Sequence, residues 1–278
     1  MSMKGRHKAG QIVSHAILIM IALYTLAPLV FLLFNSFKSN NEIVESPIAV
    51  PKQWTLDYIK NAAEQIHFLE ALGVTFTITV IAVVLLILVS SLAAWVMVRS
   101  KSKLATVLYL GFTAAMLIPF QSVMYPLLDI FEKLGLKNIP GLIIMYGGFG
   151  LSMSVFLYHG FIKSVPQSLE EAAIIDGANI FQMFFKVVFP LLKGTTVTVI
   201  VLNGMWIWND YLLPVLVLDT KKYKTISIAI QYLKGGYGSI DMGAMMGVLV
   251  LSIIPIIVFY LFCQRYIIEG VVAGAVKG

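Results

Sequence analysis

Six long apolar segments constrain this sequence more than any other feature. A helix needs roughly 20 apolar residues to cross a bilayer, and inside lipid every backbone amide must be bonded within the protein. We expect spans at 12–34, 74–98, 104–127, 140–163, 195–218 and 243–267. The pattern predicts an all-α membrane protein, with residues 1–278 forming one membrane domain and the six helices packed in a bundle.

The composition agrees with a chain that lies in lipid. It is 59% hydrophobic, 12% charged and has a mean hydropathy of +0.89, whereas soluble domains are roughly 45–50% apolar and 25% charged. A net charge of +6 would suggest nucleic acid for a soluble protein, but membrane topology explains it here. We therefore expect membrane lipid around the chain and no nucleic-acid partner.

The basic residues predict which side each loop faces. They gather before the first span, in the second and fourth loops and after the last span: Lys4, Arg6, Lys8, Arg99, Lys101, Lys103, Lys163, Lys186, Lys193, Arg265 and Lys277. Cytoplasmic loops carry such an excess. We predict a multi-pass protein of the bacterial cell membrane with both termini in the cytoplasm, although Lys221, Lys222 and Lys224 in the fifth loop oppose this topology.

Three patterns outside the span interiors predict local structure. Residues 57–70 carry apolar residues at near-helical spacing, which indicates a short helix on the outer side. Gly243 and Gly247 form a G-x-x-x-G pattern, typical of a close-packed helix face. The loop 219–242 contains several glycines and is expected to be irregular.

The fourth loop, 164–193, is too polar to span a membrane but is patterned as two short helices. Ser168 with Glu171 fits a capping box that starts the first helix. Gly177 suits the left-handed residue that ends it, and Asn179 can cap the second helix. We predict a helical knob on the cytoplasmic surface.

The side chains of the first loop helix indicate a docking element. Ala172 and Ala173 are small enough for another surface to approach the backbone, while Glu170, Glu171 and Asp176 offer acceptors to a basic or amide-rich partner. An interfacial hairpin without any partner is the alternative that these residues leave open.

The spacing of this loop resembles the signature of a known family. Glu171-Ala172-Ala173 is followed after three residues by Gly177 and later by Val187-x-Phe189-Pro190. This is similar to the cytoplasmic loop of ABC-importer permease subunits. The resemblance to the carbohydrate-uptake type, especially the second permease subunit of maltose and multiple-sugar systems, covers nearly the whole chain. It includes Ser36-Phe37-Lys38, Trp54-Thr55-Leu56, Pro119-x-Gln121, Trp208-Asn209-Asp210-Tyr211 and the tail 274–278.

The resemblance implies a type I importer permease that is not an enzyme. Its first loop helix would be the coupling helix, docked on an ATPase through Glu170, Glu171, Ala172, Ala173, Asp176, Gly177 and Pro190. The sequence has no G-x-x-x-x-G-K-[ST] loop, so ATP and Mg²⁺ would be held by the partner. The implied partners are a second homologous permease, two ATPase subunits and an extracytoplasmic solute-binding protein, and the C-terminal tail would also approach the ATPase.

Polar side chains inside the spans are candidates for the solute pathway. In the fifth span Asn203, Trp206 and Asp210 lie at i, i+3 and i+7, on one helical face, with Asn209 on the flank. Aromatic rings and amides suit a sugar or oligosaccharide. Weaker candidates are Gln121, Tyr125 and Ser152.

An ion- or proton-coupled secondary transporter is the alternative from another class. That class would show inverted halves or a buried chain of ionisable groups, whereas His159 and Asp210 are isolated in different spans. An enzyme or metal site finds little support, because the four histidines lack ligand-like spacing and Cys263 is the single cysteine.

Overall fold

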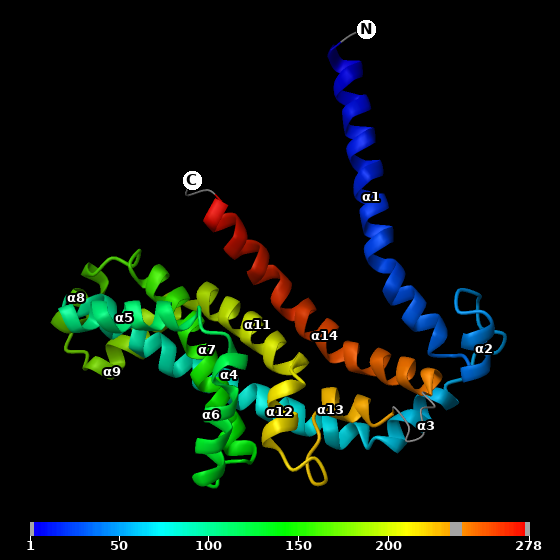
Figure 1. The fold of residues 1–278 in the computed structure, drawn as a ribbon. Coiled ribbons are helices and arrows are strands. Elements are labelled where there is room, and N and C mark those ends of the chain that lie inside the picture. Colours follow the sequence, from blue (N-terminus) through cyan, green and yellow to red (C-terminus); the bar gives the residue numbers. More distant parts are fainter. Residues whose placement is uncertain (1–2, 234–240, 276–278) are drawn as a thin grey trace. The chain divides into compact units, whose positions relative to one another are not determined.

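The computed structural model describes the backbone of residues 3–233 and 241–275 and the side chains of residues 11–233 and 241–265. Within these ranges all regular structure is helical, which confirms the all-α prediction (Figure 1). The helices are α1 Met3–Asn35, α2 Asn40–Glu45, α3 Asp57–Gln65, α4 Phe68–Arg99, α5 Lys103–Ala115, α6 Phe120–Lys133, α7 Ile139–Ile162, α8 Ser168–Ile175, α9 Ile180–Gln182, the π-helix η1 Met183–Val188, α10 Phe189–Leu191, α11 Lys193–Asn209, α12 Leu212–Val217, α13 Ile226–Gln231 and α14 Met242–Ala275.

Four helices have the length and apolar character of a membrane span. They are α1 from Gln11 onward, α4, α7 and α14 as far as Arg265. Two bent pairs bring the total to six if each pair is one span: α5 with α6, bent by 105°, and Ile180–Leu191 with α11, bent by 76°. The boundaries of the six predicted spans remain predictions.

The third predicted span, 104–127, is not one straight helix. α5 ends at Ala115 and α6 begins at Phe120, with Pro119 extended at φ −69° and ψ 140° between them. Proline has no N–H to donate, and it disfavours helical backbone in the residue before it, Ile118. Pro119 is visible in the sequence, but we predicted one continuous span here because the whole segment 104–127 is apolar.

The fifth predicted span, 195–218, is also interrupted. α11 ends at Asn209, and Asp210 has an extended backbone at φ −70° and ψ 133° before α12 begins. Asp210 therefore does not continue the helical face of Asn203 and Trp206, and our prediction of one shared face is wrong at this residue.

The chain divides into two compact units, of which unit 1 comprises Met1–Leu69 and Ala229–Pro255. Within this unit α14 packs closely on other segments: a Cβ added at Gly243 would lie 2.7 Å from the Lys38 carbonyl oxygen, and one at Gly247 would lie 3.0 Å from Ile59 Cα. Only glycine tolerates such approach, so the G-x-x-x-G prediction is confirmed.

The segment that follows α1 in unit 1 is held by buried polar groups. Lys38 is fully buried and donates from Nζ to the Ser46 carbonyl at 2.9 Å, while Asn35 donates to the Pro47 carbonyl at 3.0 Å. The predicted short helix within 57–70 is present as α3, although it ends at Gln65.

The loop 219–242 is more regular than we predicted, because it contains α13. Its glycines Gly235, Gly236 and Gly238 lie outside the described residues, as do residues 276–278 of the tail, so nothing follows for them.

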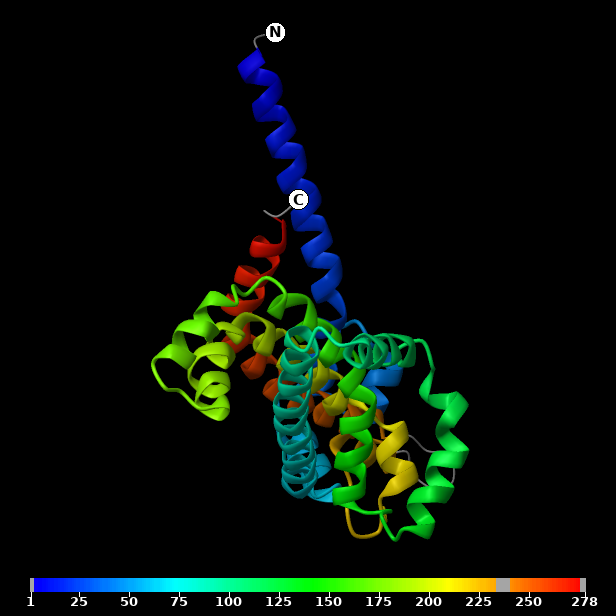
Figure 2. The ribbon, with the colours of Figure 1, turned by 90° about the vertical axis from the view of Figure 1, so that its left-hand side faces the viewer.

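Unit 2 comprises Glu70–Ile228 and Ile256–Gly278. Side chains of α4, α7, η1 and α11 form its core, including Leu86, Tyr146, Phe184 and Val199, each at most 1% exposed. The core thus joins membrane helices to the segment 164–193, whose helices α8 and α9 lie at one end of the unit in both views (Figures 1 and 2). That residues 1–278 act as one membrane domain stays a prediction.

Candidate functional site

The first helix of the loop, α8, begins differently from our prediction. The N-terminal cap is Gln167, which has helical backbone and makes no side-chain capping bond. The N–H groups of Leu169 and Glu170 already donate to the Pro166 and Gln167 carbonyls. Ser168 is therefore inside the first turn, too late to cap it, and the predicted Ser168–Glu171 capping box is wrong.

The C-terminal end of α8 confirms the role predicted for Gly177. This residue has φ +81°, a conformation that glycine adopts without a steric penalty. Its N–H donates to the Ile174 carbonyl at 3.0 Å, and the Ala178 N–H donates to the Ala173 carbonyl at 2.9 Å. These are the two bonds of a Schellman motif, which satisfies the free carbonyls of a helix end.

The second helical segment begins as the sequence predicts. Asn179 and Gln182 form a reciprocal capping box, with bonds of 2.9 and 3.0 Å. From there α9, η1 and α10 run without a gap to Leu191, and Pro190 lies within α10. Two capped segments therefore flank the turn at Gly177.

One face of α8 is fixed to the last turn of α4. Glu170 is 5% exposed, and its carboxylate accepts hydrogen bonds from Trp95 Nε1 at 3.0 Å and Arg99 Nε at 2.8 Å. Arg99 Nη2 lies 2.6 Å from the same carboxylate. Ala173, one turn further along α8, is also buried. Glu170 and Ala173 thus face the protein's own interior, and our prediction that they face a partner is wrong.

The rest of the surface of α8 is exposed. It carries Glu171, Ala172 and Asp176 of the predicted coupling residues, together with Ile174 and Ile175, which are 59% and 86% exposed. An apolar surface with carboxylates beside it is suited to bind a groove on another protein, if that groove has apolar side chains together with N–H or cationic donors.

The candidate pathway residues separate into two groups. Asn203 is 4% exposed and donates to Ser154 Oγ and the Val199 carbonyl, both at 3.0 Å. It belongs to the packed core between α7 and α11, and Ser152 is likewise buried on α7. Asn203 therefore has its hydrogen bonds satisfied by the protein itself.

The second group surrounds the break between α11 and α12. Tyr146 donates from its hydroxyl to Asp210 Oδ2 at 2.9 Å, and Asp210 Oδ1 accepts the Leu212 N–H at 3.0 Å. The Trp206 ring meets the Tyr146 ring edge to face, with centroids 5.4 Å apart, while Asn209 is exposed. Tyr146 thus contacts both Trp206 and Asp210, although these two residues do not share one helical face.

The weaker candidates Gln121 and Tyr125 lie one turn apart on α6 and are exposed. Both follow the break at Pro119, so they do not lie on a straight continuation of α5. His159, in contrast, is buried on α7 and stacks on the Tyr109 ring with centroids 3.6 Å apart.

Sequence reasoning missed Tyr146, Trp95 and Arg99. Arg99 entered only as one of several basic residues at the cytoplasmic side, yet Trp95 and Arg99 are spaced i, i+4 and therefore share a helix face. That spacing, next to a loop rich in carboxylates, was the available signal. Tyr146 had none beyond its position in an apolar span.

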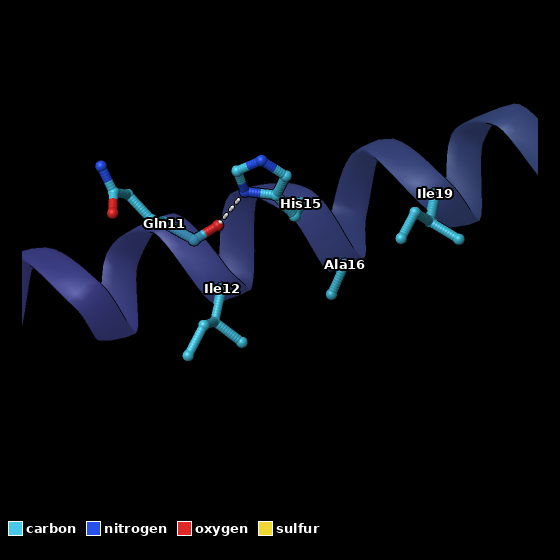
Figure 3. A pocket seen from close by; sticks show the side chains of 5 residues that line it. All are labelled: Gln11, Ile12, His15, Ala16 and Ile19. Atoms are coloured by element: carbon cyan, nitrogen blue, oxygen red, sulfur yellow. Dashed lines mark hydrogen bonds between the residues drawn. The ribbon is translucent and has the colours of Figure 1, made fainter.

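No group of three or more His, Cys, Asp or Glu side chains suitable for a metal ion occurs among the described residues. A shallow hollow runs along α1 beside Gln11, Ile12, His15, Ala16 and Ile19 (Figure 3). Its residues come from one face of a single helix, and His15 Nδ1 is 2.7 Å from the Gln11 carbonyl oxygen. Such a surface does not enclose a solute.

The family model described as "Binding-protein-dependent transport system inner membrane component" matches residues 87–272, which include α8 and its attachment to α4. The chain belongs to this family. As an inner membrane component it is a multi-pass membrane permease of a transport system, in agreement with the family resemblance of the sequence.

Individual relatives of the family cover almost the whole chain. The probable starch degradation products transport system permease protein AmyC of Thermoanaerobacterium thermosulfurigenes is 41% identical over 93% of this chain and 94% of its own length. The multiple sugar-binding transport system permease protein MsmG of Streptococcus mutans is 34% identical over 99% and 100%, respectively.

The fold is also similar to that of a solved structure. A chain of a bacterial ABC transporter involved in the import of the acidic polysaccharide alginate matches 96% of this chain and 98% of its own, with a TM-score of 0.80 and 24% identity. At this identity the likeness concerns the fold alone.

Proposed function

We propose that this chain is a permease subunit of an ATP-driven importer and forms half of a transmembrane pathway for a sugar or oligosaccharide. One observation carries the proposal: α8 presents Glu171, Ile175 and Asp176 outward, while Glu170 on its other side is bonded to the end of α4. If a partner binds the exposed side of such a helix and displaces it, the anchored side can transmit the displacement to the membrane helices.

The partners follow from what the chain lacks. Its sequence has no phosphate-binding G-x-x-x-x-G-K-[ST] loop, so two separate ATPase subunits would hold ATP and Mg²⁺ and would dock on α8. A second homologous permease would complete the pathway, and an extracytoplasmic binding protein would deliver the solute. With both termini in the cytoplasm, α8 faces the ATPase side and the Asp210 end of α11 faces outward.

The proposed cycle is alternating access. ATP binding would bring the two ATPase subunits together, and the coupling helices docked on them would move with them. The pathway would then change from inward-facing to outward-facing. ATP would favour the closed ATPase pair, and it would thereby also favour the outward-facing conformation of the permease that is docked on that pair.

A carbohydrate substrate is favoured by the relatives and by the chemistry beside the helix break. The name of AmyC mentions starch degradation products, and that of MsmG mentions multiple sugars. In this chain the partly exposed rings of Trp206 and Tyr211, about 40% and 41% exposed, lie near the polar Asn209 and Asp210. Aromatic faces pack on sugar rings, and amides or carboxylates bond hydroxyl groups.

The coupling assignment is tested with two substitutions on the exposed side of the loop. We expect Glu171→Lys and Gly177→Asp to leave the protein in the membrane but to abolish sugar uptake, the first by inverting a docking charge and the second by placing a side chain at φ +81°. Lys103→Glu is the control, because Lys103 is exposed at the start of α5 and the substitution reverses a charge as Glu171→Lys does, with the opposite sign.

Uptake of radiolabelled maltotriose, raffinose and diacetylchitobiose into cells would be compared with that of an amino acid. We expect saturable uptake of at least one sugar, lost in both loop variants and retained with Lys103→Glu. Normal uptake in both loop variants would refute the coupling role, and uptake of the amino acid alone would refute the carbohydrate class.

A further inference from the structure

Several interactions connect α8 to α4. Glu170 and Ala173 are the buried residues of α8. The Glu170 carboxylate accepts hydrogen bonds from the N–H groups of both Trp95 and Arg99. These two donors lie one turn apart on α4, and they therefore hold the carboxylate from a single rigid helix face.

Arg99 holds the loop at a second point. Its Nη2 donates to the Val165 carbonyl at 3.1 Å, in the turn that leads into α8. The guanidinium group thus fixes both the entry of the loop and the first turn of α8. The guanidinium group can do this because its N–H donors point in several fixed directions within one plane.

Trp95 reaches the other half of the loop. Its ring packs on Phe184 of η1 with centroids 5.2 Å apart, and Phe184 is itself fully buried. Phe184 also contacts Phe189 of α10, at 5.8 Å between centroids. The last turn of α4 therefore contacts the segments on both sides of the Gly177 turn.

We propose that α4 is the membrane helix that receives the movement of α8, and that Arg99 and Trp95 are the positioning residues through which it does so. The inference rests on the proposed function, because α8 must first be moved by an ATPase. The side-chain ion pair is 19% and 6% exposed for Arg99 and Glu170. It is consequently screened little by salt and water, as a link that has to transmit displacement requires.

Contacts of Arg99 and Trp95 that only stabilise the fold would give a different result from contacts that transmit movement. Loss of stabilising contacts would lower the amount of assembled complex, and ATP hydrolysis and sugar uptake would fall together. Loss of transmitting contacts would leave assembled complex that hydrolyses ATP without moving sugar. The discriminating quantity is the ratio of sugar uptake to Mg-ATP hydrolysis per assembled complex.

The experiment compares this ratio in cells and in complex purified through a tag on this chain. We expect Arg99→Ala and Trp95→Ala each to lower the ratio about tenfold, within the range typical of coupling between sites. Arg99→Lys should retain part of the ratio, because the ammonium can still reach Glu170. Trp95→Phe should also retain part of it, because its ring can still pack on Phe184 although the hydrogen bond to Glu170 is lost. Lys103→Ala, an exposed basic residue four positions after Arg99, is the control and should leave the ratio unchanged.

Arg99→Ala leaves a buried carboxylate without its cation, which lowers assembly. The double variant Arg99→Gln with Glu170→Gln carries no buried charge and is therefore measured beside it, with the same loss expected. An unchanged ratio in the double variant and in Trp95→Ala would overturn the proposal, whatever their yield. If the unmodified complex neither hydrolyses ATP nor transports maltotriose, raffinose or diacetylchitobiose, the proposed function itself fails.

Discussion

Gly150 shows how a single residue sets the distance between helices. A Cβ at this position of α7 would lie 2.6 Å from Asn203 Oδ1 and 2.7 Å from Leu86 Cδ1. Asn203 cannot easily move aside, because its amide is bonded to Ser154 and Val199. The absence of a side chain at Gly150 thus permits the contact of α7 with both α4 and α11.

We predict that Gly150→Ala destabilises the protein, although alanine favours helices by about 0.5–1 kcal/mol over glycine. Overpacking a tight core costs about 1–3 kcal/mol, so the steric effect should dominate. Gly148→Ala is the matched control, since an added Cβ there meets no atom within 4 Å. Thermal unfolding in detergent should show a lower midpoint for Gly150→Ala only; equal midpoints would mean that the helices separate without cost.

The break between α11 and α12 is an element-scale feature held by two hydrogen bonds to one carboxylate. Asp210 accepts from the Tyr146 hydroxyl and from the Leu212 N–H. An asparagine retains an acceptor oxygen for the backbone, whereas a leucine retains neither bond. The geometry of the break therefore depends on the shape and polarity of residue 210 more than on its charge.

We predict that Asp210→Asn lowers sugar uptake far less than Glu171→Lys, and that Asp210→Leu destabilises the protein by about 2 kcal/mol, at about 1 kcal/mol for each lost bond. Thermal unfolding and sugar uptake, measured together on both variants, check this. Should Asp210→Asn abolish uptake in a stable protein, the charge itself acts in transport and Asp210 moves to the centre of the mechanism.

The elements that the sequence predicted well are those with strong periodic or capping signals. The continuous apolar segments correspond to α1, α4, α7 and α14, and Gly177 and Asn179 mark the turn of the loop as expected. The break at Pro119 and the early start of α8 were missed because apolar character and a capping pattern each have two structural solutions.

At the scale of the whole molecule, the division of α8 into two faces could not have been predicted. Which of its carboxylates is buried depends on Trp95 and Arg99, more than 70 positions earlier in the chain. The motif located the segment 164–193, and only the tertiary structure distinguished Glu170, which is bonded inward, from Glu171, which is exposed.

The molecule as a whole is proposed to work only within a larger assembly, and a pull-down tests this most directly. The tagged chain would be isolated from its native membrane in mild detergent, its companions identified by mass spectrometry and the ATPase activity of the product measured. We predict an ATPase subunit and a second permease in the product, with hydrolysis stimulated by a sugar-loaded binding protein. A chain isolated alone, with transport indifferent to ATP, would contradict the proposed importer.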